Sequence, residues 1–317
     1  MKEINMQNMR VDVKENIIYF LDPSILKTLL FDRTTRKNII WATNDYASLG
    51  EQYAADQQIV PSCITGLFGN TIRPRSDKSK TEQSARVRDK AEVFTPSWVC
   101  NCQNNLIDDA WFGRSGVFNI ETEKGWLTNH DKIIFPDEKG KSWRDYVKEN
   151  RLEITCGEAP YLVSRYDSVT GEIIAINDRI GLLDRKLRIV SENTESKEEW
   201  LSWAKKAVQS VYGFDWQGDN VLLARENLLF TVMDYYEAKF GCSLEKKLEY
   251  LNELARIISW NIWQMDGLKF VVPNSCSTDC VGCAKKDVDK HDGIRCRIYD
   301  WSANCSIEFY SLCKGEK

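Results

Sequence analysis

The chain has 317 residues, 43% of them hydrophobic, which is enough for one large domain or two of ordinary size with a real core. Its 43 lysines and arginines against 47 acidic residues give a net charge of −4, which excludes a basic field over the whole surface but not a local basic face. The polar first residues do not predict a signal peptide, and no apolar run approaches the roughly 18 residues of a membrane helix. Eleven cysteines in such a chain predict reduced thiols or metal ligands, in a cytoplasmic protein without a membrane partner.

Residues 1–90 predict an N-terminal region of mixed structure that ends in a basic linker. Short apolar runs at 17–21 and 39–41 alternate with polar turns. Between residues 69 and 90, seven basic side chains stand against three acidic ones. Such a stretch could hold phosphates, or it could be a solvated surface segment, and both interpretations stay open.

An amphipathic helix is predicted to follow Phe94-Thr95-Pro96. Thr95 suits the N-cap position and Pro96 the first helical position. Val99, Cys102, Leu106 and Ala110 recur at helical spacing and form the predicted apolar face. The N–H groups at the start of such a helix could bind a carboxylate, although a well-capped helix without a ligand explains the same pattern.

The stretch 151–162, RLEITCGEAPYL, predicts a buried strand that stops in a tight turn before a helix. Glu153 stands at the end of this strand, and Gly157 lets backbone approach a ligand closely. Many α/β proteins bind a nucleotide-like ligand outside the carboxyl end of such a strand. A single glycine makes no dinucleotide-binding fingerprint, so an ordinary strand-turn-helix corner remains the alternative.

Helices and strands then alternate as far as residue 268. A helical insertion at 167–206 precedes a strand at 210–216 that ends in Asp215. Helices starting near Asp219 and at Ser243 lead to a further strand at 262–268, which contains Asp266. This alternation predicts a mainly parallel sheet with helices on its faces.

Three strand ends therefore carry an acid: Glu153, Asp215 and Asp266. The carboxyl ends of parallel strands meet at one edge of a sheet. Ribose hydroxyls and the adenine amino group are hydrogen-bond donors, and carboxylates are acceptors. The three acids together predict a site for an adenosine-type ligand.

Here the chain resembles the N6-adenine DNA methyltransferases of bacterial restriction–modification systems. Phe94-Thr95-Pro96 matches the family's F/Y-T-P element, and 153–162 is similar to its D-P-x-C-G-x-G-x-F-L loop, with Ala159 in place of the second glycine. Tyr212-Gly213-Phe214-Asp215 with 224–228, ARENL, resembles the Y-G-x-D/E…A-R-x-N-L element. Asp266-Gly267-Leu268 matches a further strand end.

The resemblance implies a Rossmann-like S-adenosylmethionine-dependent methyltransferase core over residues 91–317, incomplete at its C-terminus, with DNA as partner. It places Asp215 at the ribose and Asp266 at the adenine amino group, and it places the helix after Pro96 beside the methionine part of the cofactor. The implied S-adenosylmethionine-binding residues are Phe94, Thr95, Pro96, Glu153, Thr155, Gly157, Asp215 and Asp266.

One family element is missing. The catalytic tetrapeptide D/N/S-P-P-Y/F accepts the hydrogens of adenine N6 and stacks on the flipped base. The chain has seven prolines and no Pro-Pro pair, so we assign no catalytic residue. It could be a fragment of such an enzyme, or one half of a split enzyme whose partner chain supplies the missing element, or a degenerate binding module.

Residues 274–297 predict a zinc-knuckle-like insertion. Five candidates compete for four tetrahedral positions, and we favour Cys280, Cys283 and Cys296 with either Cys276 or His291. With all four positions filled by protein, the zinc would be structural. Basic neighbours could bring the insertion to DNA. The alternatives are free thiols in a turn-rich loop, or a zinc-stabilised assembly subunit that binds no cofactor.

Overall fold

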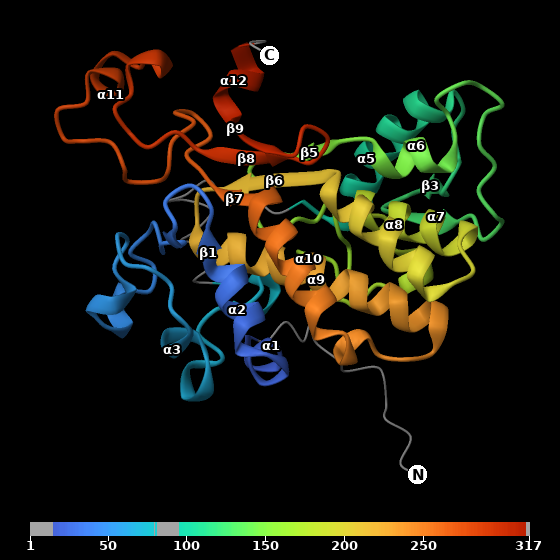
Figure 1. Ribbon diagram of the computed structural model, residues 1–317, viewed down its shortest axis with the longest axis horizontal. Coiled ribbons are helices and arrows are strands. Elements are labelled where there is room, and N and C mark those ends of the chain that lie inside the picture. Colours follow the sequence, from blue (N-terminus) through green and yellow to red (C-terminus); the bar gives the residue numbers. More distant parts are fainter. Residues whose placement is uncertain (1–14, 79, 81–94, 315–317) are drawn as a thin grey trace.

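The computed structural model describes residues 15–78, 80 and 95–314, which form a mixed α/β structure (Figure 1). At its centre, three parallel strands follow the order β5 (Arg151–Glu153), β6 (Val211–Asp215) and β7 (Ile262–Gln264). Leu152 is in register with Tyr212, and Phe214 with Trp263. The prediction of parallel strands joined by helices is therefore confirmed. The carboxyl ends of β5, β6 and β7 point the same way, as a shared ligand edge requires.

Four helices connect the central strands. Ser196 caps α8 by accepting the Glu199 N–H at 3.1 Å, and Gly241 ends α9 in the left-handed conformation. The helix predicted to start near Asp219 is α9, which begins at Gly218 with Gln217 as its N-cap. The bounds are α7 (Leu182–Asn193), α8 (Lys197–Gln209), α9 (Gly218–Phe240) and α10 (Leu248–Asn261).

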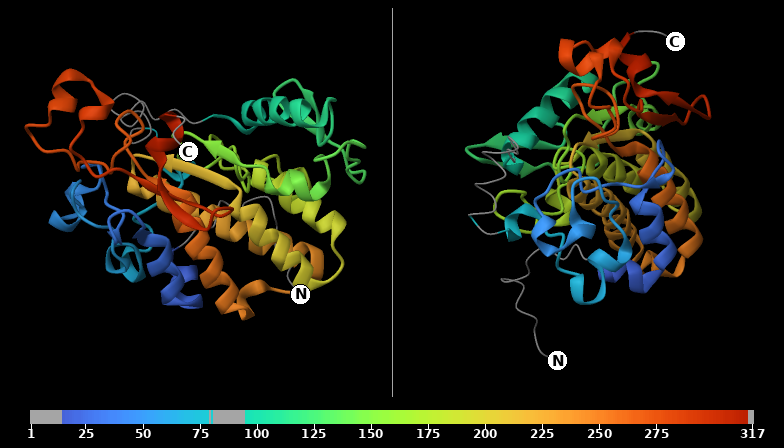
Figure 2. Two further views of the ribbon diagram at one scale, coloured as in Figure 1. Left: turned by 45° about the horizontal axis from the view of Figure 1, so that its top comes forward. Right: turned by 90° about the vertical axis from the view of Figure 1, so that its left-hand side faces the viewer.

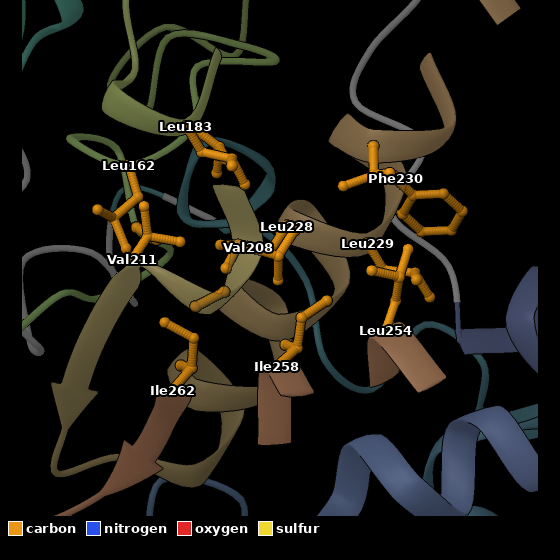
Figure 3. Close-up of a cluster of buried hydrophobic side chains, with 14 of the residues drawn as sticks. Leu162, Leu183, Val208, Val211, Leu228, Leu229, Phe230, Leu254, Ile258 and Ile262 are labelled. Atoms are coloured by element: carbon orange, nitrogen blue, oxygen red, sulfur yellow. The ribbon is translucent and has the colours of Figure 1, made fainter. Parts of the chain in front are cut away.

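These helices bury one face of the central sheet. Val211 of β6 and Ile262 of β7 are fully buried and belong to the main core, together with Leu228, Leu254 and Ile258 (Figure 3). β-Branched and γ-branched aliphatic side chains from both the strands and the helices pack together in this core. The burial of this face is the main apolar contribution to the stability of the fold.

The C-terminal segment covers the other face of β6 and β7. Phe214, Trp263 and Met265 form a second buried cluster with Ile298 and Phe309. In Figure 1 the red hairpin lies on the side of β6 opposite to α9 and α10. The elements of this segment are β8 (Arg297–Asp300), β9 (Cys305–Glu308) and α12 (Phe309–Lys314).

The N-terminal region packs on the same main core. The Arg225 guanidinium of α9 donates to the carbonyl oxygens of Leu29 and Phe31, and the Gln264 amide of β7 bonds to both the N–H and the C=O of Ile40. The predicted boundary at residues 90/91 lies outside the described residues. The elements are α1 (Glu15–Leu21), α2 (Pro23–Leu30), β1 (Phe31–Asp32), β2 (Lys37–Asn38) and α3 (Pro61–Ile64).

The remaining elements lie around the central sheet. Helix α5 (Ser97–Phe112) packs on a small hairpin of β3 (Asn119–Thr122) and β4 (Gly125–Thr128), and α6 (Trp143–Lys148) leads into β5. Helix α11 (Val281–Lys285) stands at the periphery in both views of Figure 2. Among the described helices, none combines the length and the apolar character needed to cross a membrane. Single 3-10 turns lie at 47–49, 51–53, 66–68, 75–77, 176–178, 244–246 and 288–290.

Candidate metal centre and strand-end cavity

Three sulfur atoms and one imidazole nitrogen converge in the cysteine-rich segment. The Nδ1 atom of His291 lies 3.6 Å from the Sγ of Cys276, 3.5 Å from that of Cys280 and 3.4 Å from that of Cys283. All four ligand atoms lie within 4.8 Å of one another. With Zn–S near 2.3 Å and Zn–N near 2.0–2.1 Å, the S···N edge of a zinc tetrahedron measures about 3.6 Å. The cluster could therefore hold a metal ion such as zinc.

A close backbone approach brings the two halves of this cluster together. A Cβ atom on Gly282 would lie 2.4 Å from the backbone nitrogen of His291 and 2.5 Å from the carbonyl carbon of Lys290. Only glycine therefore fits at this position between Cys280 and Cys283. On the opposite side, the carboxylate of Asp292 accepts the N–H of Ser277 at 3.1 Å. Both contacts hold the cysteine turn against the segment that contains His291.

Cys296 is not part of the cluster, which corrects the favoured ligand set. Its thiol is buried and contacts the Gln264 carbonyl oxygen at 3.5 Å, beneath Phe214 and Trp263. The Cys296 N–H donates to the carbonyl of Phe270 at 3.2 Å, which draws this residue toward the sheet and away from His291. Cys276 and His291, offered in the sequence as alternatives, are both present.

The second candidate site is a cavity of about 650 Å³ at the carboxyl ends of β5 and β6. This volume is within the usual range for small-molecule sites. Five of the eight residues predicted to bind cofactor line it: Thr95, Glu153, Thr155, Gly157 and Asp215. Its other lining residues are Gln103, Asn104, Ile107, Leu152, Ile154, Cys156, Pro160, Tyr161, Leu182, Gln217 and Asn220.

The loop between β5 and the next segment carries three residues in the left-handed conformation. Thr155, Gly157 and Ala159 have φ of +48°, +53° and +65°. Ala159 stands where the resembled family has its second glycine, and it keeps a backbone conformation that glycine adopts most readily. The N–H of Gly157 donates to Asp215 Oδ2 at 3.0 Å, so the loop folds back onto the end of β6.

Glu153 receives two backbone N–H groups from the segment that follows the loop. Its Oε1 accepts the N–H of Tyr161 at 3.3 Å, and its Oε2 accepts that of Leu162 at 3.1 Å. Burial raises the pKa of Glu153 to about 8, although these two hydrogen bonds oppose the shift. The carboxyl group thus closes the turn from within while it lines the cavity.

Asp215 is held at the end of β6 by donors from both sides of the cavity floor. Its Oδ1 accepts the N–H of Gln217 at 2.9 Å and the Asn220 amide at 3.4 Å. Together with the bond from Gly157, these contacts fix the orientation of the carboxylate beside Glu153. The cavity floor therefore presents two buried acids from neighbouring parallel strands.

The start of α5 differs from the prediction. Helix α5 begins at Ser97 with Pro96 as its N-cap, so Thr95 is not the cap, and Phe94 lies outside the described residues. Asp167 Oδ2 accepts the Ser97 N–H at 2.8 Å. Burial acts to raise the pKa of Asp167, but the Ser97 and Thr170 N–H groups outweigh it and lower that pKa. A carboxylate of the chain itself occupies this helix N-terminus, and Pro96 does not line the cavity.

Asp266 does not reach the other two acids. Strand β7 ends at Gln264, and Asp266 lies in the turn after it, where its Oδ1 accepts the N–H groups of Leu268 and Lys269 at 3.0 and 3.2 Å. Its other oxygen faces the Lys269 ammonium at 3.5 Å. Asp266 is absent from the lining of the cavity. The structure thus brings two of the three predicted acids together.

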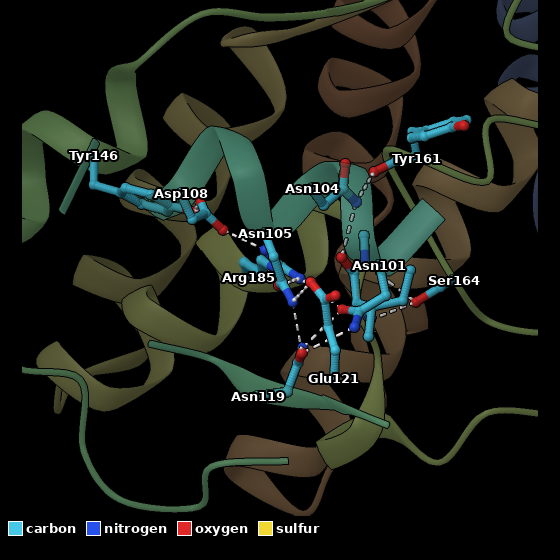
Figure 4. A network of polar contacts seen from close by, with 12 residues as sticks. Asn101, Asn104, Asn105, Asp108, Asn119, Glu121, Tyr146, Tyr161, Ser164 and Arg185 are labelled. Atoms are coloured by element: carbon cyan, nitrogen blue, oxygen red, sulfur yellow. Dashed lines mark hydrogen bonds and ion pairs between the residues drawn. The ribbon is translucent and has the colours of Figure 1, made fainter. Parts of the chain in front are cut away.

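The cavity wall formed by α5 rests on a buried polar network that the sequence did not indicate (Figure 4). The Arg185 guanidinium forms an ion pair with Asp108 and donates to the Asn101 and Asn105 amide oxygens at 2.9 and 2.7 Å. The Tyr146 hydroxyl donates to Asp108 at 2.7 Å. The buried face of α5 is therefore polar.

This network overturns the predicted apolar face of α5. Leu106 is 69% exposed and Ala110 is exposed, whereas Asn101, Asn104 and Asp108 are buried. The Asn104 amide donates to the Tyr161 and Ile180 carbonyls, both at 3.0 Å, and so ties α5 to the loop after β5. A polar face can be buried here because both terminal nitrogens of the Arg185 guanidinium donate hydrogen bonds to α5. The Nε atom of Arg185 has no hydrogen-bond partner among the described residues.

Two residues of the ARENL element also have structural partners. Arg225 is fully buried and donates to the Ile262 carbonyl at 2.8 Å, at the start of β7. The Asn227 amide donates to the Glu158 carbonyl at 3.2 Å and to the Tyr166 hydroxyl at 3.0 Å. Asn227 thus holds α9 against the loop after β5, and Arg225 holds it against the start of β7.

Comparisons with protein-family models, with curated proteins and with solved structures found no match for this chain. The two candidate sites are therefore interpreted from their own geometry and chemistry.

Proposed function

We propose that this chain is the S-adenosylmethionine-binding portion of a protein of the N6-adenine DNA methyltransferase type, with a Rossmann-like core and DNA as partner. One observation carries the proposal. Five of the eight residues that the family motifs select line a single cavity of about 650 Å³ at the carboxyl ends of two parallel strands. Ligands of open parallel sheets bind at this edge.

The chemistry of the cavity supports a ligand rich in hydrogen-bond donors. Glu153 and Asp215 contribute carboxyl groups, and Gln217 and Asn220 contribute amides. Ribose hydroxyls, an adenine amino group and an α-ammonium group would find acceptors there. Asp215 would hold the ribose, and the Gly157 turn would lie against the cofactor. Bound S-adenosylmethionine supplies an electrophilic methyl group, and the residues of this chain orient it and exclude water.

The sequence contains no D/N/S-P-P-Y/F element for the acceptor base. A methyltransferase of this type needs oxygen acceptors for the hydrogens of adenine N6 and an aromatic ring for stacking. The tetrapeptide that supplies them is missing from the sequence, which has no Pro-Pro pair. We propose that a partner polypeptide provides these groups. A labelled-methyl transfer assay with and without a candidate partner distinguishes this from a degenerate, non-catalytic binding module.

We further propose that the metal is zinc and that its role is structural. The ligands are three sulfurs and one imidazole, which is a common set for zinc. Four protein ligands complete a tetrahedron and leave no position for substrate water. The zinc would stabilise the turn that precedes β8.

Calorimetry with S-adenosylmethionine tests the cofactor proposal. We expect the wild-type chain to bind it and Asp215→Ala to lose about 10- to 100-fold in affinity, since a charged hydrogen bond contributes about 1.5–3 kcal/mol. Asp266→Ala is the matched control and should bind as the wild type does. Absent binding to the wild type, or unchanged affinity in Asp215→Ala, would refute the proposal.

A second candidate function is a zinc-stabilised DNA-binding or assembly subunit that binds no cofactor. The exposed Lys285 and Lys286, which are separated from Cys283 by Ala284 alone, favour it, because exposed basic side chains suit phosphate contacts. Metal content without S-adenosylmethionine binding, combined with DNA binding that Lys285→Glu and Lys286→Glu weaken, would select this function. Fluorescence anisotropy with duplex DNA measures the second outcome.

A further inference from the structure

Five basic side chains gather where the turn between β1 and β2 meets the end of α10 and strand β8. The Nε atom of Arg33 in this turn donates to the hydroxyl of Ser259 in α10 at 2.8 Å. The N–H of Arg297 in β8 donates to the hydroxyl of Thr34 at 3.0 Å. These hydrogen bonds hold three elements that are distant in the sequence against one another. The side chains that form this basic surface are Arg33, Arg36, Lys37, Arg256 and Arg297.

Carboxylates do not neutralise the basic surface. Among residues 15–78, 80 and 95–314, none of its five side chains forms an ion pair with an acid. The charge of Asp32 acts on Arg33, but this carboxylate already accepts the N–H groups of Thr34 and Thr35 at 3.2 and 2.9 Å. The same carboxylate also acts on the buried Arg225, so two guanidinium groups share one acid.

Two further acids stand next to the basic surface and have no ion pair with it. Glu308 is in register with Arg297, but the Arg297 guanidinium donates to the carbonyl and the hydroxyl of Ser306, at 2.6 and 3.0 Å. The Oδ1 atom of Asp300 accepts the N–H of Ser302 at 2.9 Å, within its own turn. The basic surface therefore keeps an excess of positive charge.

Two of the arginines lie close enough to disfavour each other's charge. Burial and then the charge of Arg256 lower the pKa of Arg33 to about 10. Arg33 is still charged at neutral pH, so the two positive charges remain side by side. An anion bound beside them would be attracted to both, which favours a negatively charged ligand here.

Aromatic rings orient these two guanidinium groups. The Arg33 guanidinium lies 5.9 Å from the ring centre of Trp260, and that of Arg256 lies 5.4 Å from the ring centre of Trp301. The ring of Tyr299 connects the two tryptophans, with centre-to-centre distances of 5.4 and 4.5 Å. A guanidinium that is held by a ring presents its N–H groups as a fixed fork, and this fork matches two oxygens of a phosphate.

We propose that the basic surface binds the phosphate backbone of duplex DNA. Successive phosphates can reach the β1–β2 turn, the end of α10 and β8 together, whereas a small anion meets only one or two of the five cations. Such contacts position a protein on the duplex without reading the bases. Resting on the DNA partner of the proposed function, this surface anchors the duplex apart from the cavity. Trp260 lies just before the start of β7, and the cavity lies at the carboxyl ends of β5 and β6.

An anionic membrane fits the basic surface less well. Segments that bind to a lipid surface usually combine basic side chains with apolar ones that enter the bilayer. In the described segments 31–38, 256–260 and 297–301, no large hydrophobic side chain is exposed. The phosphate backbone of a nucleic acid needs no such apolar contact, so it is the partner that this surface suits.

Fluorescence anisotropy with a labelled DNA duplex of arbitrary sequence tests the basic surface. The double variant Arg36→Glu with Arg256→Glu reverses two exposed charges. We expect it to bind at least about tenfold more weakly than wild type. The slope of log affinity against log salt should become shallower by about 1.8, at about 0.9 per lost phosphate contact. The charge-matched control is Lys246→Glu with Lys247→Glu, two exposed lysines at the opposite end of α10, which should keep the wild-type slope.

Three results would overturn the proposal. They are a wild-type chain that does not bind the duplex, a double variant that keeps the wild-type affinity and salt slope, or displacement of the labelled duplex by polyglutamate or anionic vesicles as effective as by unlabelled duplex. Circular dichroism and metal content confirm that the variants fold. Calorimetry of the wild-type chain with S-adenosylmethionine is read separately. Duplex binding through this surface without cofactor binding would refute the cofactor proposal and leave the basic surface standing, and cofactor binding without duplex binding would do the reverse.

Discussion

The metal cluster and the strand-end cavity are built from the sequence in different ways. All four potential metal ligands lie within residues 276–291, on one turn and the short segment that returns to it. The cavity takes its lining from α5, β5 and the loop after it, the start of α7, the end of β6 and the start of α9, between Thr95 and Asn220. The first site depends on local spacing, and the second on packing between distant segments.

This difference explains why the sequence-based predictions failed in different ways at the two sites. At the metal cluster the sequence missed only the choice among neighbouring ligands, because Cys296 is drawn beneath the sheet. At the cavity, the motif residues converge, but the wall that completes it is held by Arg185, whose partner Asp108 lies 77 residues earlier in the chain. Four perturbations separate the two sites, and they are given from the largest expected effect to the smallest.

Removing a metal ligand should abolish the metal cluster and leave the cavity intact. We expect Cys283→Ser to reduce bound zinc from one ion per chain to almost none, since structural zinc sites in small peptides contribute roughly 10–16 kcal/mol of apparent binding energy. Atomic emission measures the metal content. Cys305→Ser, at an exposed thiol, and Cys296→Ser should both retain zinc. Loss of zinc in Cys296→Ser would instead support the ligand set that the sequence favoured, in which Cys296 binds the metal.

Breaking the polar network around Arg185 should destabilise the cavity wall and leave the metal cluster intact. Arg185→Met leaves Asp108 buried without its cation, which costs about 3–5 kcal/mol in unfolding free energy. Arg188→Met on the same helix removes a partly exposed pair with Glu192 and should cost below about 1 kcal/mol. Urea denaturation compares the two variants, and zinc content should stay normal in both. Equal costs would mean that the network does not support the cavity wall.

The buried Glu153 should make stability fall as pH rises. Its folded pKa of about 8 lies above the ordinary value of 4.5, so between these pH values the folded state keeps a proton that the unfolded state releases. Stability then declines by about 1.4 kcal/mol per pH unit, is highest below about 4.5 and levels off above about 8. Glu153→Gln should remove this slope. If the unfolding free energies of wild type and Glu153→Gln changed equally with pH between about 4.5 and about 8, the raised pKa could not belong to Glu153.

The smallest effect is expected at Ala159. A non-glycine residue in the left-handed conformation costs about 1–2 kcal/mol, and glycine gives back part of this through greater freedom in the unfolded chain. Ala159→Gly should therefore change the unfolding free energy by at most about 1 kcal/mol, because the loss of a fully buried methyl group offsets the relief of the left-handed strain. Ala159→Val should destabilise clearly, because a β-branched side chain tolerates this conformation poorly. A tolerated valine would show that the loop relaxes to another conformation.

Local sequence patterns predicted much of the fold. The strand segments that end at Glu153 and Asp215 and the cysteine turn were evident from neighbouring residues. Each was predicted from residue types within a few positions of one another. The same is true of the metal spacing between Cys280 and Cys283.

Only tertiary structure decided the rest. The choice of the buried face of α5 depended on Arg185, and apolar periodicity at Val99 and Leu106 could not reveal a buried guanidinium supplied by another helix. Asp266 stands two residues beyond a strand that stops early, so its carboxylate bonds to its own turn. Spacing along the chain determines which groups a short segment can bring together. Long-range packing decides which of those groups face a common cavity, because burial and polar satisfaction are properties of the assembled core.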